Sequence, residues 1–238
     1  MRRATWLAAV LALAACGGDD EQPLTVYAAS SLTDVLQELE PDARYNFAGS
    51  DELATQIREG AQVDVYAAAS PRYPDELHAE GLVEAPRVFA TNRLVLVVPQ
   101  RNPQRITAVE DLLHGDSKLV VAAEGVPVGD YTREVLGRMG LSSILDRVVS
   151  EEENVRGVLA KVALGEADAG FVYATDAITA DGEVLIVPIP ASAQADVRYP
   201  VAVVAESDQQ EEAEGFVELL FSPEGRRALE RAGFGQLP

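Results

Sequence analysis

The chain has 238 residues, of which 47% are hydrophobic, and a formal net charge of −20 at pH 7. This length allows one large domain or two modest ones, and either can bury an adequate core. The excess of 39 acidic over 19 basic residues argues against nucleic acid and against electrostatic docking on an anionic membrane. It also makes an anionic ligand unexpected, unless local features of the fold override the net charge.

The first residues are typical of a secretory signal peptide. Arg2 and Arg3 precede an apolar run at 6–15 that is too short to span a bilayer. The run ends in Leu-Ala-Ala-Cys-Gly, which resembles the lipobox of bacterial lipoproteins, and Cys16 is the only cysteine. We therefore expect a signal peptide at 1–15, a lipid anchor on Cys16 and a polar tether at 16–23. The alternative is a plain signal peptide with a chance cysteine.

After the tether, apolar strand-like runs alternate with amphipathic helical segments. This alternation is typical of an α/β architecture with mostly parallel sheets flanked by helices. Strands are predicted at 24–28, 63–66, 94–98, 119–123, 169–173, 184–189 and 201–204. Helices are predicted at 32–39, 53–57, 74–79, 131–139, 155–164 and 223–231. Parallel sheets bind ligands at the carboxyl ends of their strands, so the strand-to-helix joints are the places to search for a site.

Four of these joints carry a signal. Ser30 and Ser31 precede the first helix, Ser50 can cap the second, and Asn154 is a good N-cap for a later one. The fourth joint, at 126–131, has a proline and a glycine that shape a tight turn into a helix. Each cap alone is more often structural than functional. Several helix N-termini that converge, however, offer unpaired backbone N–H groups and partial positive charge, and so can hold an anion without lysine or arginine.

The motifs at these joints, in this order, resemble the molybdate-binding proteins that serve bacterial ABC transporters. The matching runs are YAASSLTDVL, FAGSDELATQI, GAQVDVYAAAS, VPVGDY, ENVRGVLAKVALGEADAGFVYATD and YPVAVV. The resemblance implies a two-lobed periplasmic-binding-protein fold of type II, with two crossing strands between the lobes near 97–99 and 199–201. Lobe one would then comprise 24–97 plus 201–238, and lobe two 98–200.

The resemblance also implies a set of residues that bind a tetrahedral oxyanion in the cleft between the lobes. The family holds its ligand with hydroxyls and backbone amides and needs no cofactor and no direct metal-ion ligand. Carried over motif by motif, these positions are Ser31, Ser50, Val128, Val155 and Tyr173.

Three residues depart from the family pattern. Ser30 stands where alanine is common, and we expect its hydroxyl to bond to nearby backbone. Gly49 stands where the family often has another serine. Asp51 stands where a small neutral residue is usual; in the first turn of a helix it would favour the helix dipole, but turned toward the cleft it would repel a dianion.

The sequence therefore predicts a monomeric binding protein, not an enzyme, that is held on the periplasmic side of the cell envelope by its N-terminal lipid. It would deliver molybdate, and also tungstate, to the membrane permease of an ABC importer. Tungstate alone, sulfate or phosphate remain alternative cargoes. An enzyme is disfavoured because His78 and His114 are expected on the surface and no nucleophile elbow or phosphate loop is present. An intracellular regulator domain is disfavoured by the secretory start.

Overall fold

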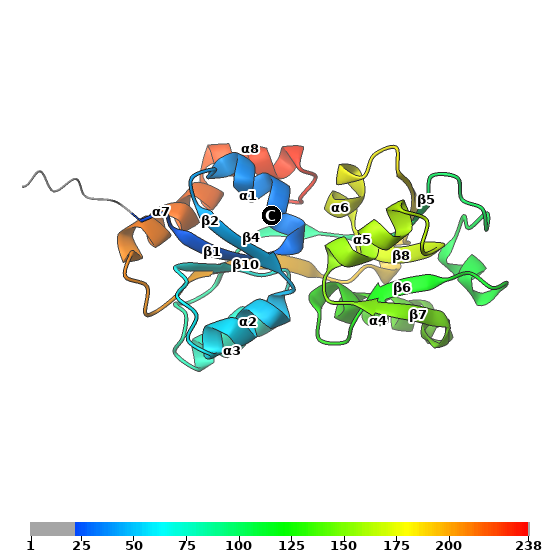
Figure 1. Ribbon diagram of the computed structural model, residues 1–238, viewed down its shortest axis with the longest axis horizontal. Helices are drawn as coiled ribbons and strands as arrows, with labels where there is room; N and C mark the ends of the chain where they lie inside the picture. The colour runs from blue at the N-terminus through cyan, green and yellow to red at the C-terminus, as the bar shows by residue number, and fades with distance from the viewer. Residues whose placement is uncertain (1–21, 238) are drawn as a thin grey trace, which may run out of the picture.

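The computed structural model describes residues 22–237 and forms two α/β lobes that lie side by side along the long axis (Figure 1). Each lobe contains one five-stranded sheet. The predicted signal peptide, Cys16 and most of the tether lie outside the described residues. From residue 22 to residue 237, no helix has the length and apolar character needed to cross a bilayer.

The first sheet lies in the lobe that contains both ends of the described chain. Its strands, in spatial order, are β2 (Arg44–Ala48), β1 (Thr25–Ala29), β3 (Val65–Ala67), β10 (Val197–Val203) and β4 (Arg87–Asn92). One face is covered by α1 (Thr33–Leu39), α7 (Gln210–Phe221) and α8 (Pro223–Arg231) (Figure 1). The other is covered by α2 (Ser50–Arg58) and α3 (Arg72–Ala79).

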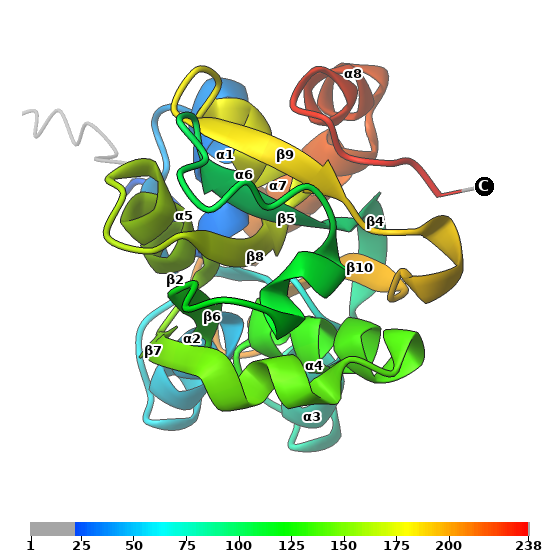
Figure 2. The same ribbon diagram turned by 90° about the vertical axis from the view of Figure 1, so that its right-hand side faces the viewer.

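The second sheet repeats this plan. Its strands, in spatial order, are β7 (Val148–Glu152), β6 (Leu119–Ala122), β8 (Ala169–Tyr173), β5 (Leu94–Pro99) and β9 (Val184–Pro188). Helix α4 (Pro127–Met139) covers one face, and α5 (Val155–Ala163) and α6 (Ala174–Thr179) cover the other (Figure 2). Short 3-10 helices complete the fold: η1 (Ser30–Leu32), η2 (Val109–Leu113), η3 (Ser142–Arg147) and η4 (Ala191–Ala193).

Two strands, β10 and β5, run antiparallel to both of their neighbours, and the chain crosses between the lobes next to each of them. The first crossing is at Arg93, between β4 and β5, and the second lies between β9 and β10. The expected crossings near 97–99 and 199–201 fall inside β5 and β10 instead. Strand pairing thus places residues 94–97 in the second sheet and residues 197–200 in the first. The expected boundaries had assigned 94–97 to lobe one and 197–200 to lobe two.

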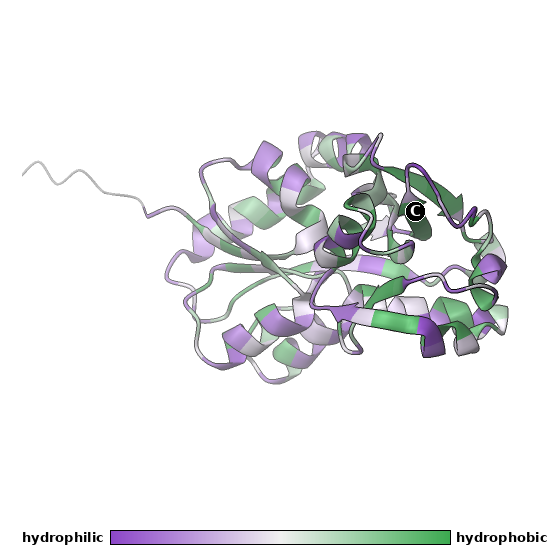
Figure 3. Ribbon diagram, turned by 45° about the vertical axis from the view of Figure 1, so that its right-hand side comes forward, coloured by the Kyte–Doolittle hydropathy of each residue, from purple (hydrophilic) through white to green (hydrophobic). Residues whose placement is uncertain are grey.

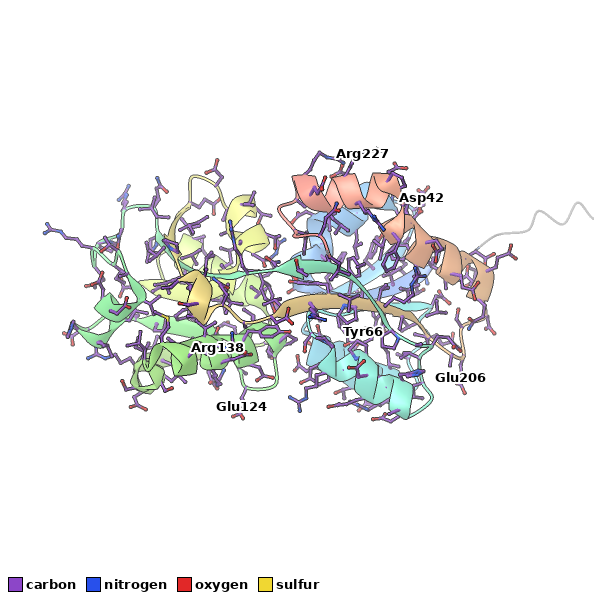
Figure 4. All side chains as sticks on the ribbon, turned by 180° about the vertical axis from the view of Figure 1, so that it is seen from behind. Asp42, Tyr66, Glu124, Arg138, Glu206 and Arg227 are labelled. Atoms are coloured by element: carbon purple, nitrogen blue, oxygen red, sulfur yellow. The ribbon has the colours of Figure 1, made fainter. Side chains whose placement is uncertain are left out.

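The strands are the hydrophobic part of the molecule, and the outer faces of the helices are polar (Figure 3). Every residue of β8 is buried, as are the first five residues of β5. Seen from behind, labelled charged residues such as Asp42 and Arg227 lie at the outside, whereas Tyr66 lies inside the first lobe (Figure 4). The buried Tyr66 hydroxyl donates a 2.6 Å hydrogen bond to the Ser50 carbonyl and so anchors the start of α2.

The predicted caps are confirmed in the second lobe and wrong in the first. The Asn154 side chain caps α5 by accepting from the Gly157 amide at 3.0 Å. Neither Ser31 nor Ser50 caps a helix: α2 has Gly49 at its N-cap, and α1 follows the 3-10 turn that contains Ser31. The physical reason is that both serine hydroxyls are engaged with other buried groups.

Candidate functional site

A small cavity lies between the lobes, at the carboxyl ends of the parallel strands of both sheets. It is lined by residues of both lobes. The five residues predicted to bind ligand all line it, and they are Ser31, Ser50, Val128, Val155 and Tyr173. The structure therefore brings together positions that are far apart in the sequence, as parallel-sheet architecture requires.

The cavity wall contains no charged residue and is rich in hydrogen-bond donors. Ser50 and Val155 are the first residues of α2 and α5, and Val128 lies in the first turn of α4. Amides in the first turn of a helix have no acceptor within the helix, and the helix dipole gives them partial positive charge. Three helix N-termini from two lobes thus converge on one small space, and this arrangement favours an anion.

The two predicted serine hydroxyls are each bonded to a second buried group. The Ala69 amide donates to Ser50 Oγ at 3.1 Å. Ser31 Oγ lies 2.9 Å from the hydroxyl of Tyr199, a buried residue of β10. Since an amide can only donate, Ser50 Oγ is fixed as an acceptor in that bond and keeps its own proton for the cavity.

The Tyr173 hydroxyl is the third side-chain donor at the cavity. Its oxygen is buried and has no hydrogen-bond partner among residues 22–237. A buried hydroxyl without a partner costs about 1–3 kcal/mol, so such a group needs an explanation. Burial raises the pKa of Tyr173 well above its ordinary value, so the hydroxyl keeps its proton and can donate to an anion.

Direct contacts between the lobes flank the cavity on two sides. On the α3–α4 side, the Tyr73 hydroxyl donates to the Gly125 carbonyl at 2.5 Å, and Arg72 lies 3.4 Å from Asp130. On the α1–α5 side, Arg156 pairs with Asp34 at 2.5 Å. The structure is therefore a closed arrangement of the lobes, and the cavity has walls from both.

Arg156 also holds a buried carboxylate on its own lobe. Its Nε lies 2.8 Å from Asp176, whose side chain is fully buried. Burial raises the pKa of Asp176 to about 7, an effect that the Arg156 guanidinium limits. This ion pair supports the start of α5, next to the Val155 amide, but neither residue lines the cavity.

The three departures from the family pattern have distinct positions. Ser30 lines the cavity beside Ser31, and the bond of its hydroxyl to nearby backbone stays a prediction. A side chain at Gly49 would have its Cβ 2.6 Å from the Glu153 carbonyl and 2.6 Å from Asp51 Oδ1. The closed lobes therefore leave no room for serine there. Asp51 does not line the cavity, and burial raises the pKa of its carboxyl.

Other predicted features lie on the surface. His78 and His114 are exposed, as expected. Over residues 22–237, no group of three or more His, Cys, Asp or Glu side chains is arranged to hold a metal ion.

Sequence reasoning missed Tyr199 and Ala69, the two residues that bond to the serines. Tyr199 was available in the YPVAVV run and in the expected crossing near 199–201, but it was not expected to take part in the site. Its side chain also contacts the rings of Tyr173, Phe234 and Phe89, with centroids 5.8, 5.3 and 6.4 Å away.

Comparison with known proteins identifies the family of this chain. Residues 24–235 match the model of the family described as bacterial extracellular solute-binding proteins. The chain belongs to this family. The molybdate-binding protein ModA of Mycobacterium tuberculosis (strain ATCC 25618 / H37Rv) is 34% identical over 248 residues, which cover 95% of this chain and 94% of that protein. ModA of Escherichia coli (strain K12) is 31% identical over 231 residues, with 90% of each chain covered.

The fold of this solute-binding protein agrees with that of a solved relative. The Azotobacter vinelandii periplasmic molybdate-binding protein has a TM-score of 0.80, with 21% identity, and the match covers 90% of this chain and 99% of that one. At this identity the likeness establishes the fold, which is the predicted two-lobed α/β architecture of type II.

Proposed function

We propose that this solute-binding protein captures molybdate in the cavity between its lobes and delivers it to the membrane permease of an ABC importer. The observation that carries the proposal is the uncharged cavity wall, on which three helix N-termini and the hydroxyl residues Ser30, Ser31, Ser50 and Tyr173 converge. The printed function of the 34% identical relative supports molybdate as the cargo. Tungstate has nearly the same size and charge, and we propose that it binds as well. The five lining residues Ser31, Ser50, Val128, Val155 and Tyr173 would hold the oxyanion.

The proposed site distinguishes oxyanions by their protons. Molybdate, tungstate and sulfate are fully deprotonated dianions near neutral pH, whereas phosphate often keeps a proton that needs an acceptor. The helix amides can only donate, Ser50 Oγ already uses one of its two lone pairs on the Ala69 amide, and the lining residues include no carboxylate to accept a phosphate proton. An unpaired phosphate proton in the closed cavity would cost about 1–3 kcal/mol, which is about one to two decades of affinity. Sulfate would be excluded only by the fit of the cavity.

Calorimetric titration of the purified protein with molybdate, tungstate, sulfate and phosphate tests the proposal. We expect tight binding of molybdate and tungstate, weak binding of sulfate and the weakest binding of phosphate. Phosphate or sulfate bound more tightly than molybdate would make the protein a receptor for that oxyanion instead. No binding of any oxyanion would overturn the site as a whole.

The proposal extends to how the protein is held at the membrane. A lipid on Cys16 and a tether to residue 23 would keep a monomer on the periplasmic side of the envelope, with no catalytic step. Cells that express the Cys16→Ser variant should release the protein from the membrane fraction. Unchanged membrane association in that variant would contradict the lipid anchor and leave the oxyanion site untouched.

A further inference from the structure

The hydroxyl of Tyr199 has a place in the structure that the proposed binding site does not by itself explain. Tyr199 lies on β10, does not line the cavity, and is fully buried. Its oxygen lies 2.9 Å from Ser31 Oγ and 3.4 Å from Asn92 Nδ2. The Tyr199 hydroxyl therefore lies between Asn92, which is next to the first crossing between the lobes, and Ser31, which lines the cavity.

The direction of these hydrogen bonds follows from Asn92. The Arg93 amide donates to Asn92 Oδ1 at 2.9 Å, and an amide nitrogen cannot accept, so this oxygen is the acceptor of the Asn92 side chain. Asn92 Nδ2 is then a donor, both to Thr175 Oγ1 at 2.9 Å and to the Tyr199 hydroxyl oxygen.

The Tyr199 proton then has one acceptor within reach, which is Ser31 Oγ. If Ser31 donated to Tyr199 instead, the tyrosine proton would be buried without an acceptor, and this is the costly arrangement. With Tyr199 as donor, Ser31 uses one lone pair for the tyrosine and keeps its single proton. Ser31 lines the cavity, so this proton is available to a ligand there.

We propose that Tyr199 is a positioning residue of the oxyanion site, which directs the Ser31 proton into the cavity by donating its own proton to Ser31 Oγ. This inference rests on the proposed oxyanion function. Tyr199 does for Ser31 what the Ala69 amide does for Ser50: each supplies a fixed donor behind the serine. Both serines thereby keep a proton that can be donated to a fully deprotonated oxyanion.

The test is a double-mutant cycle measured as molybdate affinity by calorimetry. Tyr199→Phe removes the hydroxyl and keeps the ring contacts with Tyr173, Phe234 and Phe89. We expect it to weaken binding about tenfold, the effect of one hydrogen bond. In a Ser31→Ala background the same change should have less than a twofold effect, because its target is gone. In a Ser50→Ala background it should again weaken binding about tenfold.

A matched control is Tyr45→Phe, which removes a hydroxyl that donates to the Leu36 and Glu40 carbonyls in the same lobe. We expect its molybdate affinity to equal that of the wild type. An equal loss from Tyr199→Phe with and without Ser31 would show a general structural effect and overturn the inference, as would no loss at all. Failure of the wild type to bind molybdate would instead refute the proposed function.

Discussion

The start of α4 offers a sharp test of the view that a backbone amide holds the ligand. Gly129 follows Val128 in the first turn of this helix. A Cβ at Gly129 would lie 2.2 Å from the Ala123 carbonyl oxygen and 2.5 Å from that of Ala122. Both atoms belong to the backbone at the end of β6, so no side-chain rotation relieves the overlap. Gly129→Ala must therefore push the first turn of α4 away from the sheet.

The size of the effect follows from these distances. Ordinary contacts of a Cβ begin at 3.4 Å, so the backbone has to yield by roughly 1 Å, and a hydrogen bond stretched that far is lost. A bond from the Val128 amide to a charged oxyanion is worth about 1.5–3 kcal/mol, so we expect molybdate affinity to fall ten- to hundredfold. The overpacking should also lower the free energy of unfolding by about 1–3 kcal/mol.

The same helix supplies the control. Gly137 is exposed, and its Cβ would have only Ser142 Oγ nearby, at 4.0 Å. Gly137→Ala should raise the free energy of unfolding by about 0.5–1 kcal/mol and leave binding unchanged. Both variants are measured by calorimetric titration and by chemical denaturation. A Gly129→Ala protein that binds molybdate as tightly as the wild type would refute a ligand role for the Val128 amide.

Three further predictions concern the groups around the cavity. Tyr173→Phe removes a buried hydroxyl that lacks a protein partner, so it should raise the melting temperature of the ligand-free protein while weakening molybdate binding; a loss of both would contradict this. The pKa of Asp176 is raised to about 7 in the folded state, so its contribution to stability is present below about pH 4 and is lost as pH rises through 7, by at most about 4 kcal/mol. Asp176→Asn should flatten that decline in a comparison of melting temperatures from pH 5 to pH 8, and an unchanged pH profile would count against it. Asp34→Asn breaks the ion pair with Arg156 between the lobes. Because the Asp34 side chain is 59% exposed, molybdate affinity should fall by a factor of only about two to five. A hundredfold loss would show that this ion pair controls closure of the lobes.

Most strands that the sequence predicts are buried inside a sheet, with the edge strand β9 as an exception, and the strands that it does not predict lie mostly at the edges. Strands β5, β6 and β8 lie inside the second sheet and consist largely of buried apolar residues. Strands β2, β4 and β7 were not predicted, and each is an edge strand with polar or half-exposed positions. An edge strand has only one neighbour and often faces water, so its composition is that of a loop.

Two omissions have other causes. The first half of β10 was not predicted because Pro200 interrupts it, and the register indeed shifts between Tyr199 and Pro200. Helix α7 carries a clear apolar stripe, with Ala213, Phe216 and Leu220 buried, so its signal was available in the sequence.

The sequence predicted the residues of the candidate site that lie in local motifs. It did not predict the residues that reach the site only through contacts between distant parts of the chain. Ser50 and Val155 stand at strand-to-helix joints, and their motifs can be recognised in a single sequence. The donors behind the serines cannot be found in this way: Tyr199 is 168 residues from Ser31, and Ala69 is 19 residues from Ser50. Their role appears only when the sheet brings them together.

The net charge of −20 and the proposed site for a dianion are compatible because the two act over different ranges. Surface charges are screened within about 8 Å at physiological salt, whereas the donors of the cavity act at contact distance. The N-termini of α2, α4 and α5 each present a partial charge of about +0.5, without any cation in the wall. A lysine in the same place would attract any anion from a range of directions. Fixed amides and oriented hydroxyls instead bind only oxygens that lie along their N–H and O–H bonds, so in the proposed site the geometry of the donors, and with it Tyr199, would set which oxyanion is accepted.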